Sequence, residues 1–375
     1  MDLKKHFIIP IFLSNAGCPS KKKCIFCNQH ASGGDSVALT ETDQFIRKYL
    51  YDISKNNNMN EHSFEIAFYG GTFTALEINI QSRLMEGALV ALAEFGVPPS
   101  RFKGIRISTR PDFITDEILK NLKSHNVKTI EIGVESFNDR VLEYSNRNYT
   151  GKCAYNALKS IKANGFELSV HLMCGLPFQT REIFMGDIFK TLEIEPEYAR
   201  IHPLCVIKGT ELEKLLDEKR TELFTDDAEL IKQTSLALCY LESGGIKVIR
   251  IGILENEKFR KEVISGPAYP NLREIVEGEI HEALFQLLRR EAPEIKTFEI
   301  KTASEKIKNY IIGYKKENIK KNSDIFLEIK NNLLYNNCDI KYEDFPYIQI
   351  TGIKPFEFLK IVNRLDILKE YINNT

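Results

Sequence analysis

Three features are missing from the sequence, and each absence excludes a class of protein. There is no excess of charge, because 51 lysines and arginines stand against 52 aspartates and glutamates, so the whole surface does not attract nucleic acid. No apolar run approaches the roughly 20 residues of a membrane span. No internal repeat or low-complexity tract is present, which argues against a repeat array. Any nucleic-acid site must therefore be a local patch, and we expect no membrane partner.

The N-terminus imitates an export signal, but we do not expect it to act as one. The segments MDLKKH, FIIPIFL and NAGC imitate a short signal with a lipoprotein-type cysteine. However, the apolar run contains Pro10 and is shorter than such signals require, and Cys24 and Cys27 follow at once. Eight cysteines without a signal suit a reducing compartment, in which thiols bind metal or stay free. We therefore expect a cytoplasmic protein.

The chain reads as one large α/β domain followed by a smaller region. Its 375 residues, 43% of them hydrophobic, can bury a substantial core. Short apolar strands alternate with longer amphipathic segments, which is typical of parallel βα units. After Arg250 helical and strand-like runs mix, so we predict a first domain over 1–250 and a C-terminal α+β region over 251–375 that packs on it. The expected strands are Phe7–Leu13, Phe64–Tyr69, Gly104–Ser108, Thr129–Val134, Glu167–Met173 and Tyr198–Leu204.

Three cysteines in one short loop predict a metal site. Cys18, Cys24 and Cys27 lie in GCPSKKKCIFCNQ, and three thiolates can hold three corners of a cubane iron–sulfur cluster. The fourth iron would lack a protein ligand and could bind an exchangeable small molecule. With His30 the same cysteines could instead form a tetrahedral Cys3His zinc site, as in a non-catalytic, zinc-stabilised interaction protein. The loop alone leaves both alternatives open.

Motifs at the ends of successive predicted strands favour the cluster. They are GGT at Gly70–Thr72, STRPD, IEIGVES followed by Arg147, and HLMCGLP. In this order they resemble the radical S-adenosylmethionine (SAM) enzymes, in particular the branch with the Elongator catalytic subunit and the oxygen-independent coproporphyrinogen oxidases. The resemblance covers roughly Phe7 to Arg250, and implies an open six-unit (β/α) partial TIM barrel with its site at the C-terminal ends of the strands. One departure is the five residues between the first two cysteines, where the family commonly has three.

The resemblance implies a 4Fe-4S cluster on the three cysteines and SAM bound beside it. It places Phe26 near the adenine, the backbone of Gly70, Gly71 and Thr72 near the amino group, and Arg147 on the carboxylate, which a guanidinium fits bidentately. The remaining cofactor contacts that it implies are Ser108, where relatives often carry glutamate, Glu135, where relatives commonly carry glutamine, and His171, near the ribose or the substrate.

Some of these residues also have simpler interpretations. Without its context Arg147 would read as a surface arginine, and His171 as a satisfied core histidine. Arg110 and Asp112 of the TRPD motif look like the Elongator version, but they could also form an ion pair that fixes the turn at Pro111.

The implied function is reductive cleavage of SAM to a 5′-deoxyadenosyl radical that takes hydrogen from a substrate. The partners would be SAM and an electron donor such as flavodoxin or ferredoxin. The stretch ARIHPLCVIKGTELEKL resembles Elongator-like proteins, which makes RNA, and tRNA modification, one candidate. Nothing after Arg250 reads as an acyl-CoA-binding acetyltransferase, so the overall Elongator reaction is not implied. A small molecule or a protein is the alternative substrate.

Overall fold

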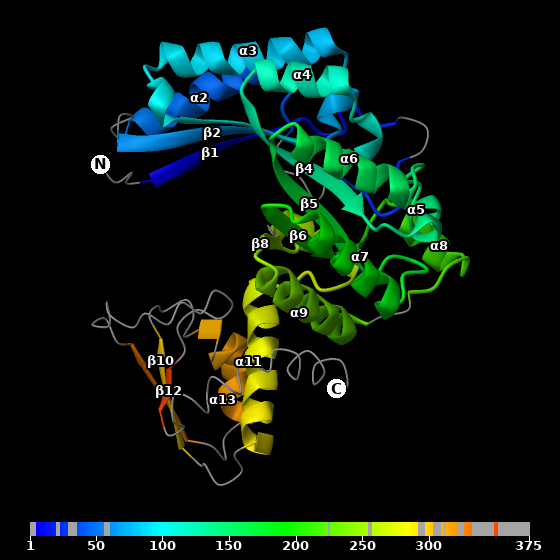
Figure 1. The fold of residues 1–375 in the computed structure, drawn as a ribbon. Coiled ribbons are helices and arrows are strands. Elements are labelled where there is room, and N and C mark those ends of the chain that lie inside the picture. Colours follow the sequence, from blue (N-terminus) through cyan, green and yellow to red (C-terminus); the bar gives the residue numbers. More distant parts are fainter. Residues whose placement is uncertain are drawn as a thin grey trace.

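A curled, parallel sheet forms the centre of the protein (Figure 1). The computed structural model describes residues 5–19, 23–28, 36–55, 61–223, 226–253, 257–291, 297–302, 309–310, 312–321, 326–331 and 349–351. Within them the sheet has seven strands in the order β1-β2-β3-β4-β5-β6-β8, and all neighbours are parallel. The strands are β1 (Lys5–Phe12), β2 (His62–Tyr69), β3 (Phe102–Thr109), β4 (Val127–Glu135), β5 (Glu167–Cys174), β6 (Tyr198–Pro203) and β8 (Lys247–Ile251).

The open barrel is confirmed, but the number of strands is corrected from six to seven. Each predicted strand overlaps one of β1 to β6, whereas β8 was missed. Its sequence, KVIRI, is short, and only Val248 and Ile251 are buried, because a strand at the edge of the sheet has a neighbour on one side only. The predicted boundary after residue 250 falls inside this strand and stays a prediction.

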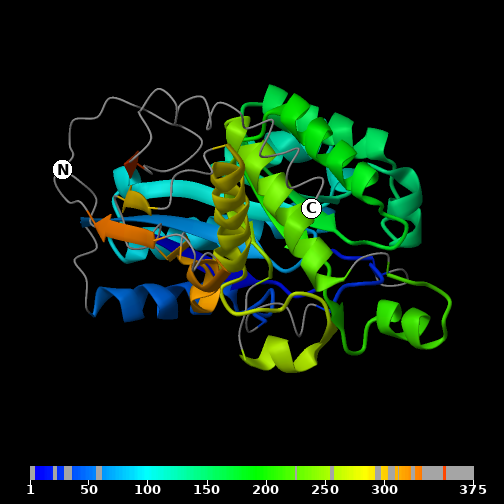
Figure 2. The same cartoon turned by 90° about the horizontal axis from the view of Figure 1, so that it is seen from below.

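Helices cover the outer face of the sheet (Figures 1 and 2). Three of them begin at threonine caps, since the side chains of Thr115, Thr150 and Thr180 each accept a hydrogen bond from the backbone N–H three residues later. Such caps satisfy amide groups that the first helical turn leaves unpaired. The covering helices are α2 (Thr42–Ser54), α3 (Ile78–Glu94), α4 (Asp116–Ser124), α6 (Gly151–Ala163), α7 (Arg181–Ile194) and α9 (Asp227–Ser243).

The two faces of the sheet differ in polarity because side chains alternate along a strand. The outward residues are apolar and fully buried under the helices, for example Ile105 and Ile107 on β3 and Ile130 and Ile132 on β4. Burying each such side chain stabilises the fold by about 1.5–3 kcal/mol. The intervening residues lie on the inner face and include three buried charged side chains, Glu65 on β2, Arg106 on β3 and Glu131 on β4. The apolar core therefore lies outside the barrel, and its interior is polar.

The second region joins the barrel through α11 (Leu272–Glu291). Arg273 on this helix donates to the Val248 carbonyl at 2.6 Å, and Ser235 of α9 donates to the Val276 carbonyl at 3.2 Å.

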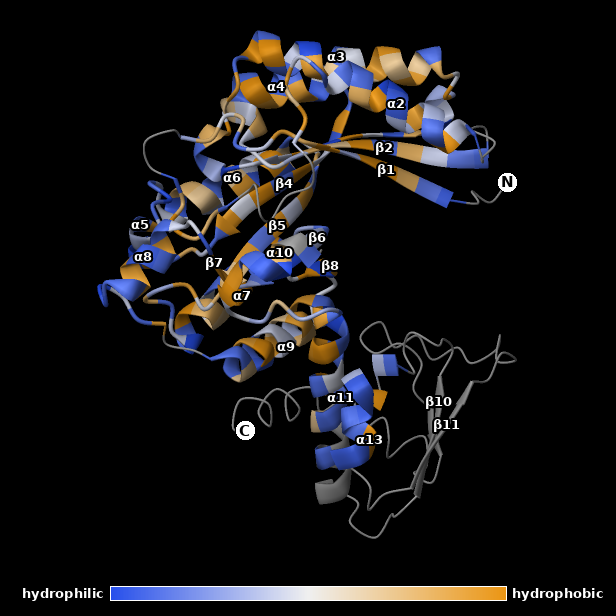
Figure 3. Cartoon of the chain, turned by 180° about the vertical axis from the view of Figure 1, so that it is seen from behind, coloured by the Kyte–Doolittle hydropathy of each residue, from blue (hydrophilic) through white to orange (hydrophobic). Residues whose placement is uncertain are grey.

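In Figure 3 β4 and β5 are largely orange, while α11 and α13 show broad blue surfaces. Among the described residues, no helix combines the length and the apolar character that crossing a bilayer requires.

The remaining elements are short. β7 (Val206–Ile207) pairs with β9 (Val263–Ser265), and β10 (Thr297–Thr302) pairs with β11 (Phe326–Asn331) and β12 (Gln349–Thr351). The other helices are α5 (Asp139–Tyr144), α8 (Glu211–Asp217), α10 (Glu257–Glu262) and α13 (Glu317–Lys321).

Candidate functional site

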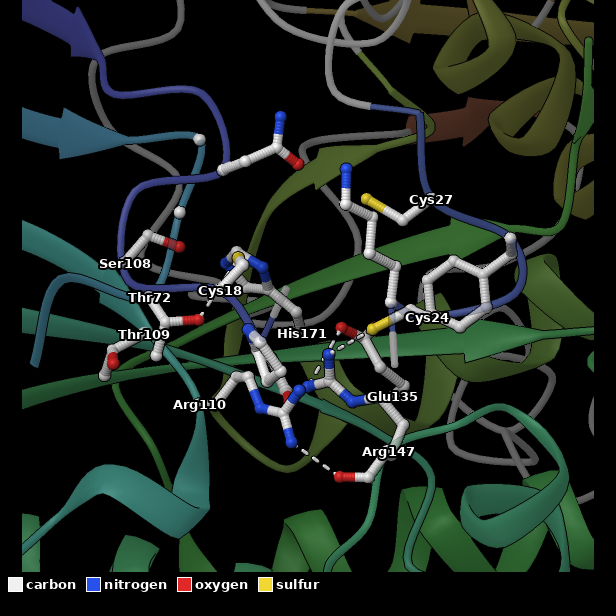
Figure 4. A pocket seen from close by; sticks show the side chains of 17 residues that line it. Cys18, Cys24, Cys27, Thr72, Ser108, Thr109, Arg110, Glu135, Arg147 and His171 are labelled. Carbon is white, nitrogen blue, oxygen red and sulfur yellow. Dashed lines mark hydrogen bonds and ion pairs between the residues drawn. The ribbon is translucent and has the colours of Figure 1, made fainter. Parts of the chain in front are cut away.

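One pocket lies at the C-terminal ends of β1 to β5 (Figure 4). Parallel strands bring their carboxyl ends to one edge of a sheet, so motifs far apart in sequence meet there. The pocket is lined by every residue predicted for the cofactors, namely Cys18, Cys24, Phe26, Cys27, Gly70, Gly71, Thr72, Ser108, Glu135, Arg147 and His171. The structure thus brings the predicted set together, while the role of each residue stays a prediction.

The GGT turn after β2 holds the cysteine loop in place. The Thr72 N–H donates to the Ala16 carbonyl at 2.8 Å, and the Asn15 N–H donates to the Gly70 carbonyl at 2.7 Å. A Cβ on Gly71 would lie 2.3 Å from the Ala16 oxygen, so only glycine permits this approach. The Cys18 thiol lies 3.4 Å from the Thr72 hydroxyl. The motif predicted to contact SAM therefore also positions the first cysteine.

The three thiols share an environment that suits metal binding. Burial, together with the neighbouring Cys24 and Cys18 thiols, raises the pKa of Cys27 to about 12. Bound iron would supply the positive charge that a thiolate here requires, so the donor set fits a cluster. Among the described residues, no three Cys, His, Asp or Glu side chains are grouped to hold a single metal ion. His30, on which the zinc alternative depends, lies outside the described residues.

Arg147 is buried in the pocket, so its interpretation as a surface arginine is wrong. Only 5% of the residue is exposed. Its Nε donates to the Tyr149 hydroxyl at 2.9 Å, its Nη1 lies 3.3 Å from Cys24 Sγ, and its Nη2 donates to the Gly133 carbonyl. Burial opposes the charge, but Tyr149, Cys24 and Glu135 hold the pKa of Arg147 well above its ordinary value. A permanent cation therefore faces the second cysteine.

The TRPD motif bonds the backbone of Arg147 and so helps to position it. Arg110 donates through Nη2 to the Arg147 carbonyl at 2.6 Å. It also pairs with both carboxylate oxygens of Asp112, at 2.9 and 2.8 Å. The ion pair expected from the sequence is therefore present, and it orients Arg110 toward the pocket, which Arg110 also lines.

A bulge at the end of β4 aims Glu135 into the pocket. The pairing of β4 with β5 shifts register between Gly133 and Glu135, and Glu135 has a φ of 62°, in the left-handed region. Such bulges redirect side chains and occur next to active sites. Glu135 Oε1 consequently lies 3.5 Å from Arg147 Nη2.

Gly133→Ala is expected to weaken about tenfold the SAM binding that the sequence predicts for this pocket. An added Cβ would lie 2.8 Å from Glu135 Oε1 and 3.1 Å from Arg147 Nη2, so both side chains must move, and the loss of a hydrogen bond to a charged group has this magnitude. Anaerobic calorimetry with SAM measures it. Gly186→Ala on α7 is the matched control, because nothing lies within 4 Å of its added Cβ. Equal affinities in the two variants would contradict the prediction.

His171 lines the pocket and is also satisfied by a buried partner. Its Nε2 lies 2.9 Å from Glu131 Oε2, and its side chain is 12% exposed. Glu131 is fully buried and also accepts from Arg106 at 2.9 Å and Arg200 at 2.7 Å. Burial alone would raise the pKa of Glu131, but His171, Arg200 and Arg106 lower it to about 2. His171 therefore connects the pocket to charges deeper in the barrel.

Sequence reasoning missed part of the pocket lining. The additional lining residues are Asn15, Pro19, Lys23, Thr109, Arg110 and Gly133. All lie within three residues of a predicted site residue, so the motifs themselves carried the signal. Glu131 had no such signal as the partner of His171, because the two residues lie 40 positions apart on neighbouring strands.

Comparison with known proteins agrees with this geometry. Residues 13–188 match the Radical SAM superfamily, and residues 196–282 match the Radical_SAM C-terminal domain. A solved structure, an archaeal Methanocaldococcus infernus Elp3 with an N-terminal deletion, superposes with a TM-score of 0.59 at 19% identity, covering 76% of this chain and 63% of that one. This likeness shows the fold.

Two curated relatives have different names. A tRNA uridine(34) acetyltransferase of Methanocaldococcus jannaschii is 24% identical over 302 residues, which is 72% of this chain and 54% of that protein. A heme chaperone HemW of Lactococcus lactis is 27% identical over 186 residues, which is 48% and 47% of the two chains. The chain spans about half the length of these relatives.

Proposed function

Because the chain belongs to the radical SAM superfamily, we propose that it binds a 4Fe-4S cluster and cleaves SAM reductively to a 5′-deoxyadenosyl radical. The observation that carries this proposal is the single pocket lined by the cysteine triplet, the GGT turn and the buried Arg147. A reducing compartment such as the cytoplasm suits the free thiols, and a flavodoxin or ferredoxin would be a suitable electron donor.

The proposed chemistry divides between the cofactors and the chain. When bound, the cluster supplies an electron and SAM supplies the radical that removes hydrogen from the substrate. Cys18, Cys24 and Cys27 would hold the cluster. Arg147 would pair with the SAM carboxylate, because its guanidinium already faces the cysteine loop. The chain's task is to bind, orient and exclude water.

The other pocket residues would complete the SAM site. Phe26 lies between two cluster cysteines and would contact the adenine, while the backbone of Gly70 to Thr72 would meet the amino group. Ser108, Glu135 and His171 come from three successive strands. They would line the side of the cofactor that faces the barrel interior.

RNA is the substrate that we propose, with modification of tRNA as the reaction class. The support is the similarity to a protein named as a tRNA uridine(34) acetyltransferase. Acetyl transfer is not part of the proposal, because the chain spans about half of that relative. Residues 1–250 would supply the radical chemistry and residues 251–375 would contribute to substrate choice. RNA that co-purifies at moderate salt supports this substrate, and stable turnover of a small molecule without RNA contradicts it.

Anaerobic purification followed by metal analysis tests the chemistry. We expect about four irons and four sulfides per chain, and 5′-deoxyadenosine on addition of dithionite and SAM. Stoichiometric zinc without iron would instead identify the Cys3His alternative.

Arg147→Ala is expected to weaken SAM binding by about 1.5–3 kcal/mol, the cost of a lost hydrogen bond to a charged group. Anaerobic calorimetry measures the affinity, and iron analysis shows whether the cluster persists. Arg147→Lys should recover only part of the loss, because an ammonium lacks the bidentate fork. Arg83→Ala, on the exposed side of α3, is the control. SAM affinity that is the same in all three variants would remove Arg147 from the site.

A further inference from the structure

The inner face of the barrel carries more positive than negative charge next to the cofactor pocket. Arg106 bonds both Glu65 and Glu131, at 3.0 and 2.9 Å, and Arg200 bonds Glu131 at 2.7 Å. Arg250 on β8 lies in register with Arg200 on β6. Three arginines thus stand against two carboxylates, and both carboxylates are already engaged.

The Arg250 side chain makes neither a hydrogen bond nor an ion pair within the part of the chain that the structure describes. It is only partly exposed, and burial together with the charge of Arg200 lowers its pKa, although Tyr69 and Glu131 oppose the shift. A partly buried cation without a partner is costly. Such a charge is retained where a ligand neutralises it, which makes this position a candidate for substrate binding.

Two further donors next to Arg250 lack partners. Arg200 Nε and His202 Nε2 are buried and have no hydrogen-bond partner. An unsatisfied buried polar group costs about 1–3 kcal/mol, and native proteins contain few of them. Burial and the charges of His171, Arg200 and Arg250 keep the pKa of His202 well below its ordinary value, so its ring is neutral and can donate one N–H. All three unpaired groups can therefore act as donors.

We propose that Arg200, His202 and Arg250 form a binding site for an oxyanion of the substrate, either a phosphate or a carboxylate group. The proposal rests on the function proposed above and specifies its substrate. Guanidinium groups fit both oxyanions with paired hydrogen bonds, and an anion would neutralise the excess charge. Glu131 offsets this charge only in part, because its carboxylate is shared among Arg106, Arg200 and His171.

The site is close to the cofactor pocket. His171 lines that pocket, and its ring centroid lies 5.6 Å from that of His202. An oxyanion held by His202 would therefore be about one side chain away from the pocket in which the radical forms.

Anion binding to the anaerobic, cluster-loaded protein tests this site. The probes are inorganic phosphate and acetate, each compared with chloride at equal ionic strength, and the readout is the rise in unfolding temperature with anion concentration. We expect Arg250→Gln to need at least about tenfold more anion for the same rise. Without added anion, Arg250→Gln should unfold at a higher temperature than the parent, because it removes an unpaired charge beside Arg200. Arg83→Gln is the matched surface control.

The outcomes separate the two oxyanions and the two proposals. A response to phosphate alone identifies a phosphorylated substrate, and a response to acetate alone identifies a carboxylate. Equal anion dependence in the parent, Arg250→Gln and Arg83→Gln overturns the site, even if iron content and SAM cleavage are normal. Protein without iron that still shows the Arg250-dependent response contradicts the proposed function and retains the anion site.

Discussion

Replacing any one of Cys18, Cys24 and Cys27 with alanine is expected to abolish the cluster and SAM cleavage. Each thiolate would ligate one iron, and no other cysteine among the described residues lines the pocket. Removing a hydrogen-bond partner of a metal ligand already costs about 10- to 100-fold in affinity or activity. The loss of a ligand itself should therefore exceed about 100-fold. The measurements are iron and sulfide content, the visible absorbance, and 5′-deoxyadenosine formation under anaerobic conditions.

Cys153→Ala is the matched control for these variants. Cys153 is a partly exposed cysteine on α6, outside the pocket, so its replacement should leave cluster content and cleavage at the level of the parent. Full iron content and turnover in the variant lacking all three pocket cysteines would refute the proposed cluster site.

Glu131→Gln is expected to lower the free energy of unfolding by about 3–5 kcal/mol, the usual cost of removing one partner from a buried ion pair. Glu131 is fully buried, and its carboxylate is shared by Arg106 and Arg200. Glutamine has nearly the same shape but leaves Arg200 without its carboxylate partner and Arg106 with Glu65 alone. Urea unfolding of parent and variant measures the difference. Glu86→Gln, at an exposed carboxylate, should change stability by less than about 0.5 kcal/mol.

The free energy of unfolding measured at acidic pH provides a second test of the role of Glu131. Its pKa is lowered from 4.5 to about 2 in the folded protein, so the folded state favours the charged form. This contribution is fully present above pH 4.5 and is lost as the pH falls toward 2. In Glu131→Gln the free energy of unfolding should not show this part of the decrease at acidic pH. The same pH dependence in parent and variant would show that other carboxylates account for it.

The sequence predicts the barrel and the pocket well because both depend on local patterns. Apolar alternation locates β1 to β6, and the motifs at their ends must meet because parallel strands share one carboxyl edge. β8 is not predicted because it is an edge strand in which only Val248 and Ile251 are buried. The bonds from Glu131 to Arg106 and Arg200 are not predicted for a different reason. They join residues 25 and 69 positions apart, and only the register of the strands determines that they face each other.

The two interpretations of His171 show a similar limit. The sequence allowed a core histidine or a ligand-contacting one, and the side chain is both bonded to Glu131 and part of the pocket lining. Arg147 was easier to assign, since its position after IEIGVES matched a known motif. Its contact with the Gly133 carbonyl is made at the bulge in β4, which no local sequence pattern predicts.

The anchoring of the cysteine loop has a consequence for how the cluster would be repaired. The GGT turn holds the loop on one side, through Thr72 and Asn15. On the other side the Ile25 carbonyl accepts from the Leu212 N–H at 2.9 Å. The described parts of the loop, residues 15–19 and 23–28, are thus held in the folded chain before iron arrives, which lowers the entropy cost of binding it. Oxygen damage to the cluster would leave a preformed cradle that iron and sulfide can refill without refolding of the barrel.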